Sequence, residues 1–350
     1  MNSNSSDGVI EEPAQSHRVL VLGATGTAGQ ATTRALLRAG HRVSCLVRAG
    51  KYGDDIESIR SSAGLPADVE LCMGDVTDSL SLKQDAFAGR AFNTLVSCLT
   101  SRTGAPADAW AIDHRAHCLA LEAAKESGVT HMVLLSAICV QKPLLAFQQA
   151  KLAFERELID SGLTYSIVRP TAFFKSLSGQ VDRVRRGKPF LLFGDGTLTA
   201  CKPISDNDLG DYMAGCLVKR ERYDQILPVG GPGNAMTLRE QGEILFSLTG
   251  QKPRFRQVPV EMFDGVRVVL EQLGKVSKKC ADKAELARIG RYYATESMLV
   301  LNTETGRYDA ELTPSTGTDT LQDFYAALLD GSASVSRGEH SVFGERHEKP

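Results

Sequence analysis

The sequence predicts a doubly wound α/β protein, a parallel sheet with helices on both faces, extended by a smaller lobe on its C-terminal side. Two observations lead to this prediction. Up to about residue 170, short apolar runs alternate with longer segments of helical periodicity, and strands separated in this way join through right-handed crossovers. A glycine-rich turn also follows the first apolar run directly, a position typical of sheets that bind phosphates.

The first half of the chain supplies the strands and helices of the predicted sheet. The expected strands are Arg18–Leu22, Arg42–Val47, Val69–Met73, Thr94–Cys98, His131–Leu135 and Tyr165–Val168. The clearest helices between them are Ala28–Ala39, Ala107–Ser127 and Leu145–Ser161. Gly40, Gly128 and Gly162 stand at the ends of these helices, where a left-handed residue commonly terminates a helix.

After Arg169-Pro170 this alternation stops, and turns rich in Gly and Pro separate short strands from helices. Helices are expected near 206–219, 237–249, 259–273 and 281–292. We therefore divide the chain into a disordered tail at 1–16, the sheet domain at 17–170, a substrate lobe packed on the sheet at 171–331, and a second disordered tail at 332–350.

Composition excludes several classes of function. The 350 residues include 42 acidic and 40 basic side chains, a net charge of −2, which does not favour nucleic acid as a partner. No run approaches the ~20 apolar residues of a membrane helix, and residues 1–15 are polar and acidic, unlike a signal or transit peptide. The eight cysteines form no CxxC pair, so we expect reduced, buried thiols and a reducing compartment.

The glycine-rich turn reads Gly23-Ala-Thr-Gly26-Thr-Ala-Gly29 and opens a helix. Gly23 permits the tight turn, Gly26 lets backbone amides approach a pyrophosphate, and Gly29 lets the helix pack closely on the strand. The helix N-terminus then offers oriented N–H groups to the phosphates. Together with Thr25, Thr27 and Ala28, these glycines form a predicted dinucleotide site of the Rossmann type.

The ends of the next strands predict which nucleotide binds. Arg48 follows the second strand, where an acidic residue would hold the ribose of NAD, and a guanidinium suits a 2′-phosphate. We therefore expect NADPH as the cofactor of residues 17–170. Asp75 and Val76 follow the third strand, where the carboxylate would accept a bond from the adenine amino group. The backbone of Ser97-Cys98-Leu99, at the end of the fourth strand, would line the cofactor's edge.

These motifs carry a family resemblance. The glycine-rich turn, Arg48, Asp75-Val76, the segment 123–129 and Arg169-Pro170-Thr171 resemble the NmrA-like group of atypical short-chain dehydrogenase/reductases. Within that group, the stretches 139–155, 169–180, 187–190, 230–233 and 292–298 are similar to the divinyl chlorophyllide a 8-vinyl reductases. The resemblance spans about residues 17–330.

The resemblance implies an NADPH-dependent reduction of the 8-vinyl group of 3,8-divinyl chlorophyllide or protochlorophyllide a to ethyl, in chlorophyll or bacteriochlorophyll biosynthesis. It implies a magnesium tetrapyrrole as the small-molecule partner. The lack of a transit peptide favours a cytoplasmic bacterial enzyme, with peripheral contact to a photosynthetic membrane left open. Two alternatives stand beside it: another NmrA-like reductase of enones, quinones or phenylpropanoids, and a regulator that senses NADP(H) without chemistry.

The catalytic motif departs from the short-chain dehydrogenase pattern. That pattern places Tyr and Lys four residues apart on one helix face, but here Phe147 and Lys151 hold the two positions. Phenylalanine has no proton to give, so reduction of a carbonyl is disfavoured. We expect Lys151 to bind the nicotinamide ribose, and Ser136, after the fifth strand, to share the catalytic site. The final proton would come from water or from Tyr165, Lys142 or Lys175.

A flat tetrapyrrole needs an apolar slot with a few polar anchors. Phe147, Phe173 and Phe174 are candidate walls, and Leu177 with the segment 190–193 could extend them. Basic side chains could meet a propionate; they are Lys175, Arg183, Arg185 and Arg186. His114 and His117 lie on one helix without a nearby third ligand, so we predict no metal site in the protein itself.

Overall fold

A computed structural model describes residues 16–48, 55–265, 270 and 278–335. Seven strands in this part of the chain form one sheet in the order β3-β2-β1-β4-β5-β6-β9, with every neighbouring pair parallel. The strands are β1 (Arg18–Leu22), β2 (Arg42–Val47), β3 (Glu70–Met73), β4 (Thr94–Ser97), β5 (His131–Leu135), β6 (Thr164–Pro170) and β9 (Gln225–Val229). The strand order reverses between β1 and β4, and this switch point is where doubly wound sheets bind ligands.

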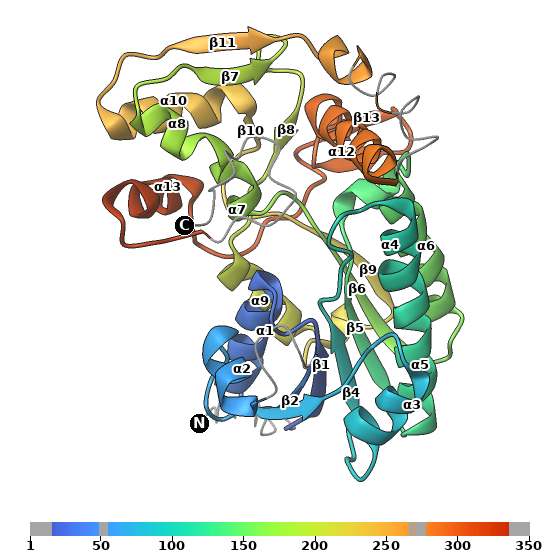
Figure 1. Ribbon diagram of the computed structural model, residues 1–350. Helices are drawn as coiled ribbons and strands as arrows, with labels where there is room; N and C mark the ends of the chain where they lie inside the picture. Colours follow the sequence, from blue (N-terminus) through green and yellow to red (C-terminus); the bar gives the residue numbers. More distant parts are fainter. Residues whose placement is uncertain (1–15, 49–54, 266–269, 271–277, 336–350) are drawn as a thin grey trace, which may run out of the picture.

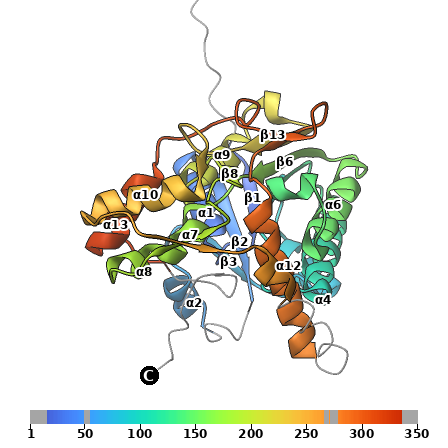
Figure 2. The same ribbon diagram turned by 90° about the horizontal axis from the view of Figure 1, so that it is seen from above.

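The two faces of the sheet bury alternate side chains of each strand. In β1, Val19 and Val21 join one apolar cluster, whereas Leu20 and Leu22 join another on the opposite face. The first face is covered by α1 (Thr27–Arg38), α2 (Ile56–Ser62) and α9 (Asp206–Gly215); the second is covered by α5 (His117–Glu126) and α6 (Ala146–Ile159). Figures 1 and 2 show the sheet between these two helix layers. The predicted doubly wound fold is confirmed.

Most predicted elements appear within one or two residues of their expected bounds. Three strands match fully: β1, β2 and β5. The predicted helix ends at Gly40, Gly128 and Gly162 all have positive φ, between 80° and 81°. The predicted helix 107–127 is divided, however, into α4 (Pro106–Ala109), a π-helical segment η2 (Trp110–Ala116) and α5.

The division of the chain at residue 170 does not follow the structure, because the chain returns to the sheet after that point. Strand β9 pairs with β6, from Ser166 opposite Gln225 to Pro170 opposite Val229. Helix α9 packs on α1 so closely that a Cβ at Gly210 would lie 2.7 Å from the Ala31 carbonyl carbon. The Rossmann layer therefore includes residues 206–229.

The remaining elements form the second lobe, above the sheet in Figure 1. Its small sheets pair β7 (Phe190–Phe193) with β11 (Phe255–Val258), β8 (Ala200–Cys201) with β10 (Met236–Thr237), and β12 (Val300–Asn302) with β13 (Arg307–Asp309). Its helices include α7 (Phe174–Leu177), α8 (Val181–Arg185), α10 (Leu238–Thr249), α12 (Lys278–Thr295) and α13 (Leu321–Asp330). The side chains of α7, α8, α10 and α13 share one apolar core.

Helix α10 shows how local chemistry sets the ends of an element in this lobe. Thr237 and Glu240 form a reciprocal capping box at its start, which satisfies two amides that the helix leaves open. Gly250 ends it with φ 64°. The helix predicted near 259–273 falls partly outside the described residues; within them, 261–265 are helical. The tails predicted at 1–16 and 332–350 also lie mostly outside them.

Candidate active site and cofactor site

The glycine-rich turn has the geometry that its sequence predicts. Gly23 has φ +75°, and a Cβ there would lie 2.7 Å from the backbone carbonyl of Cys98, at the end of β4. A Cβ at Gly29 would lie 2.1 Å from the Gly23 carbonyl oxygen. Neither position accepts a side chain without moving backbone, so both glycines are required by close packing at the switch point.

The first turn of α1 is open to an anion. The Gly26 amide donates to Gly23 O at 3.1 Å and the Gln30 amide donates to Gly26 O at 2.8 Å. Among the described residues, no group accepts a hydrogen bond from the amides of Thr27, Ala28 and Gly29. Unpaired amides at a helix N-terminus bind phosphate, so the chain fits a dinucleotide here. Thr25 lies in the same turn, and its carbonyl accepts from Gln30.

Arg48 and Asp75 lie at the carboxyl ends of the adjacent strands β2 and β3. Arg48 is exposed. Partial burial alone would raise the pKa of Asp75, but hydrogen bonds from Thr77 and the charge of Arg48 outweigh it and lower that pKa. Asp75 is therefore an anion beside Arg48. Val76 packs partly against the core below.

Lys151 is held by a carboxylate that the sequence analysis did not identify. Its Nζ lies 3.0 Å from Asp113 Oδ1, and the two side chains are 9% and 0% exposed. Burial alone would raise the pKa of Asp113, but Lys151 and the Ser101 amide overcome this effect and lower it. Asp113 is therefore an anion, and the ion pair holds the Lys151 side chain in place on α6.

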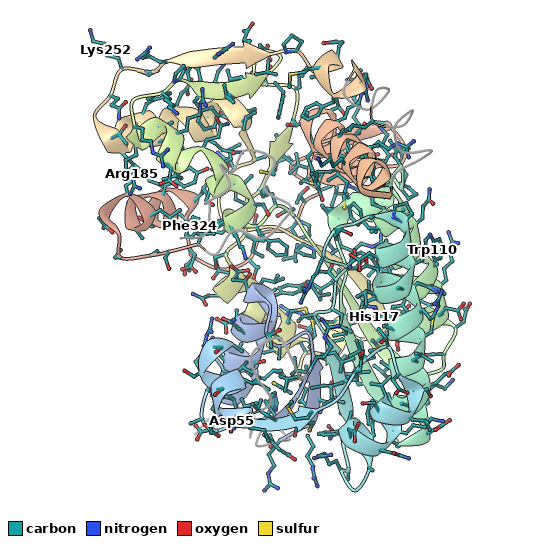
Figure 3. All side chains as sticks on the ribbon, in the orientation of Figure 1. Asp55, Trp110, His117, Arg185, Lys252 and Phe324 are labelled. Atoms are coloured by element: carbon teal, nitrogen blue, oxygen red, sulfur yellow. The ribbon has the colours of Figure 1, made fainter. Side chains whose placement is uncertain are left out.

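His117 completes this buried group. It is the first residue of α5, four residues after Asp113, and is labelled in Figure 3. Burial, followed by the charge of Lys151, lowers its pKa to about 4, so the ring is neutral at pH 7. Its Nδ1–H donates to Ile112 O at 2.9 Å, because a carbonyl only accepts. Nε2 then accepts from the Ser97 hydroxyl at 2.8 Å. Ser97 thus faces His117 with its side chain and offers only its backbone to the cofactor.

Ser136 belongs to a second buried network. Its hydroxyl donates to Glu155 Oε1 at 2.5 Å, and the same carboxylate pairs with Arg169. Ser136 is 6% exposed and Glu155 is 2% exposed. Since its proton is committed to Glu155, the Ser136 oxygen presents lone pairs, rather than a donor, to any further partner. The sequence analysis missed Glu155, which stands four residues after Lys151 on α6.

The three aromatic residues predicted as substrate walls lie in different surroundings. Phe147 is partly buried in the apolar cluster that joins α6 to α12. Phe173 packs partly against the core of the sheet. Phe174 is a correction: it is 4% exposed and packs on Phe324 of α13, with ring centroids 5.5 Å apart. It fills the core of the second lobe and has almost no surface to offer a substrate.

The structure also separates the predicted proton donors. Tyr165 lies at the amino end of β6, opposite the edge where the cofactor turn lies. Lys142 pairs with Glu296 at 2.7 Å. Lys175 reaches the cofactor turn, where its Nζ donates to Thr27 Oγ1 at 3.2 Å.

No metal-binding group of His, Cys, Asp and Glu occurs among the described residues, and His114 contacts the Trp110 ring.

Comparison with known proteins assigns the family. An NAD(P)H-binding family model matches residues 23–220. Divinyl chlorophyllide a 8-vinyl-reductase of Zea mays is 47% identical over 95% of this chain and 84% of its own length. The chain belongs to the divinyl chlorophyllide a 8-vinyl-reductases. The rice (Oryza sativa subsp. indica) member of this family is 48% identical over 93% of the chain and 82% of its own length.

Solved structures share the fold at much lower identity. An NADPH-dependent quinone oxidoreductase of Escherichia coli in complex with NADPH has a TM-score of 0.64 at 17% identity, over 89% of this chain and 99% of that one. Leucoanthocyanidin reductase of Vitis vinifera, with NADPH, has a TM-score of 0.64 at 14% identity over the same shares. The family's plant members are described as chloroplastic. Within the described residues, no helix has the length and apolar character to cross a membrane.

Proposed function

We propose that this protein reduces the 8-vinyl group of 3,8-divinyl chlorophyllide a or protochlorophyllide a to ethyl, with NADPH as the hydride donor. Family membership over nearly the whole chain supports the reaction, and the open first turn of α1 supports the dinucleotide. The expectation of a cytoplasmic bacterial protein stays a prediction, as does contact with a membrane surface.

One observation carries the proposal: an apolar ring stands one helical turn before a fixed cation. Phe147 packs in the cluster that includes Ile289 and Tyr292 of α12, and Lys151 is paired with Asp113 behind it. A carbonyl substrate would need an acid near its oxygen. A vinyl group has no oxygen, so an apolar residue at position 147 fits it and leaves room for contact with a macrocycle.

The chemistry of the vinyl group explains how a site without a phenol at this position could work. When bound, the nicotinamide supplies a hydride, which is two electrons and one hydrogen. Addition of hydride to the terminal vinyl carbon leaves negative charge on the carbon attached to the ring, and the conjugated macrocycle delocalises it. A proton added to that carbon completes the ethyl group. The protein's part is then to orient the two reactants in a site that excludes water.

Within this proposal Lys151 binds the nicotinamide ribose, and its charge favours the electron-rich state of the substrate. Asp113 keeps the ammonium in place, and the neutral His117 fixes the end of β4 beside it. Ser136 acts as an acceptor toward bound groups, because its hydroxyl hydrogen is donated to Glu155 in a hydrogen bond. Phe147 and Phe173 remain the proposed substrate walls. The proton donor is water in this account, because Tyr165 is at the amino end of β6, Lys142 is paired with Glu296 and Lys175 donates to Thr27.

Arg48 supports NADPH over NADH. It is exposed beside Asp75 at the carboxyl end of β2, where the adenosine ribose of a bound dinucleotide lies in this fold. A guanidinium there can form charge-assisted hydrogen bonds to a 2′-phosphate. Asp75 still has a carboxylate oxygen without a described donor, which suits the adenine amino group.

The test compares Phe147→Tyr and Phe147→Ala with the unaltered protein in steady-state reduction of divinyl chlorophyllide by NADPH. We expect Phe147→Tyr to keep turnover within about tenfold, because an unpaired hydroxyl costs at most a few kcal/mol. Phe147→Ala should mainly raise KM for the tetrapyrrole through lost contact area. No NADPH oxidation with this substrate would reject the proposal. Turnover of an enone or quinone in its place would favour another NmrA-like reductase, and NADP(H) binding without any turnover would favour a sensor.

A further inference from the structure

A lysine of the second lobe reaches the cofactor turn of the Rossmann layer. Lys175 lies on α7, which follows β6 through residues 171–173. Its Nζ donates to the hydroxyl of Thr27 at 3.2 Å, across 148 positions of sequence. Thr27 is the first residue of α1. The ammonium group therefore stands at the open N-terminus where the amides of Thr27, Ala28 and Gly29 have no described acceptor.

One carboxyl group interacts electrostatically with Lys175. Asp206 begins α9, which packs along α1. Burial raises the pKa of Asp206, and the charges of Lys175 and Arg34 partly oppose that shift. A lysine ammonium has three N–H donors, and one of them is used by Thr27. In the part of the chain that the structure describes, the Lys175 ammonium makes no other hydrogen bond, so two donors are left for a phosphate at this end of α1.

We propose that Lys175 binds the pyrophosphate of the dinucleotide and so makes the second lobe part of the cofactor site. The proposal needs only NAD(P)H binding at the glycine-rich turn; it does not depend on the vinyl substrate. The open amides of α1 attract a phosphate oxygen, and Lys175, hydrogen-bonded to Thr27 in the same turn, adds a positive charge there. Because a pyrophosphate is doubly charged, a cation from a second element strengthens binding more than neutral amides alone.

The position of Lys175 favours the pyrophosphate over the two other anionic groups that could bind a lysine. The 2′-phosphate would bind at the end of β2, beside Arg48, away from the first turn of α1. If Lys175 instead bound a propionate of the substrate, it would do so only after the cofactor had bound. Removing the lysine would then leave the affinity for the cofactor unchanged. A pyrophosphate ligand affects NADPH and NADH equally, because both nucleotides carry the same group.

The test measures direct binding of NADPH, NADH and 2′-AMP to Lys175→Met, without any tetrapyrrole. We expect affinity for NADPH and for NADH to fall by the same factor, about tenfold or more, as for loss of a charge-assisted hydrogen bond. Binding of 2′-AMP, which lacks the pyrophosphate, should stay unchanged and shows that the nucleotide pocket is intact. Lys175→Arg should recover most of the affinity.

The matched control is Lys252→Met, because Lys252 is an exposed lysine at the far end of the second lobe. It should bind both dinucleotides normally. Three results would overturn the proposal: unchanged affinity of Lys175→Met for both dinucleotides, a loss confined to NADPH, or a raised KM for the tetrapyrrole with normal cofactor affinity. A protein that bound dinucleotide through Lys175 but did not reduce a vinyl group would leave this inference standing and reject only the proposed reaction.

Discussion

Removing either member of the Lys151–Asp113 pair should destabilise the protein strongly, whereas removing both should not. The two side chains are 9% and 0% exposed and their charged atoms lie 3.0 Å apart. Asp113→Leu leaves a buried ammonium without its partner, and Lys151→Met leaves a buried carboxylate. Breaking a buried pair in this way costs about 3–5 kcal/mol, because the remaining charge is neither solvated nor compensated.

The double variant Asp113→Leu/Lys151→Met replaces both charges by apolar groups of similar size, so its free energy of unfolding should lie within about 2 kcal/mol of the unaltered protein. Urea unfolding of the four proteins, without cofactor, gives the coupling energy of the cycle. We expect at least about 3 kcal/mol. The double variant should also fold but bind NADPH poorly, which separates the structural role of the pair from the role of Lys151. A coupling energy below about 1 kcal/mol, typical of solvent-exposed pairs, would refute the reasoning.

Further predictions concern the cofactor and the pH dependence of stability. Arg48→Ala should raise KM for NADPH about tenfold to a hundredfold and leave KM for NADH nearly unchanged; equal effects on both would remove Arg48 from the 2′-phosphate site. Burial lowers the pKa of His117 and of His131 to about 4. Below the ordinary histidine pKa, the unfolded chain therefore binds protons that the folded protein does not bind. Stability should then decrease as pH falls from about 6.5 to 4, by about 3 kcal/mol for each histidine at the lower limit, and urea midpoints that stay constant over this range would contradict it. Gly29→Ala should abolish NADPH binding, because its Cβ would lie 2.1 Å from Gly23 O; normal binding in an equilibrium titration would show that the turn adapts.

The sequence was sufficient for the first six strands of the sheet and the helices between them, because the signals for these elements are local. Apolar runs bounded by turns predict strands such as β1, β2 and β5 to the residue, and glycines such as Gly40 mark helix ends through a positive φ that other residues adopt rarely. The glycine-rich turn was predicted for the same reason. Its glycines are needed because backbone atoms approach them closely, either from a few residues away or from the adjacent strand.

Features that depend on distant partners were not predictable in this way. Strand β9 is an edge strand of five residues that contains Pro228, and its pairing with β6 is set by the whole sheet. The π-helical segment that turns Asp113 toward Lys151 looks like ordinary helix in the sequence. Phe174 was predicted as a substrate wall because its apolar character is visible in the sequence, but its partner Phe324 stands on α13, far along the chain.

In the proposed reaction, hydride passes from the nicotinamide to the 8-vinyl group, and this transfer can be followed with an isotope label. The protein is incubated with 3,8-divinyl chlorophyllide a and NADPH that carries deuterium at both hydrogens of C4, in ordinary water. We expect a product whose 8-ethyl group contains one deuterium per molecule, with one NADPH oxidised for each vinyl group reduced. An 8-ethyl group with no deuterium, or deuterium located in another part of the macrocycle, would contradict it.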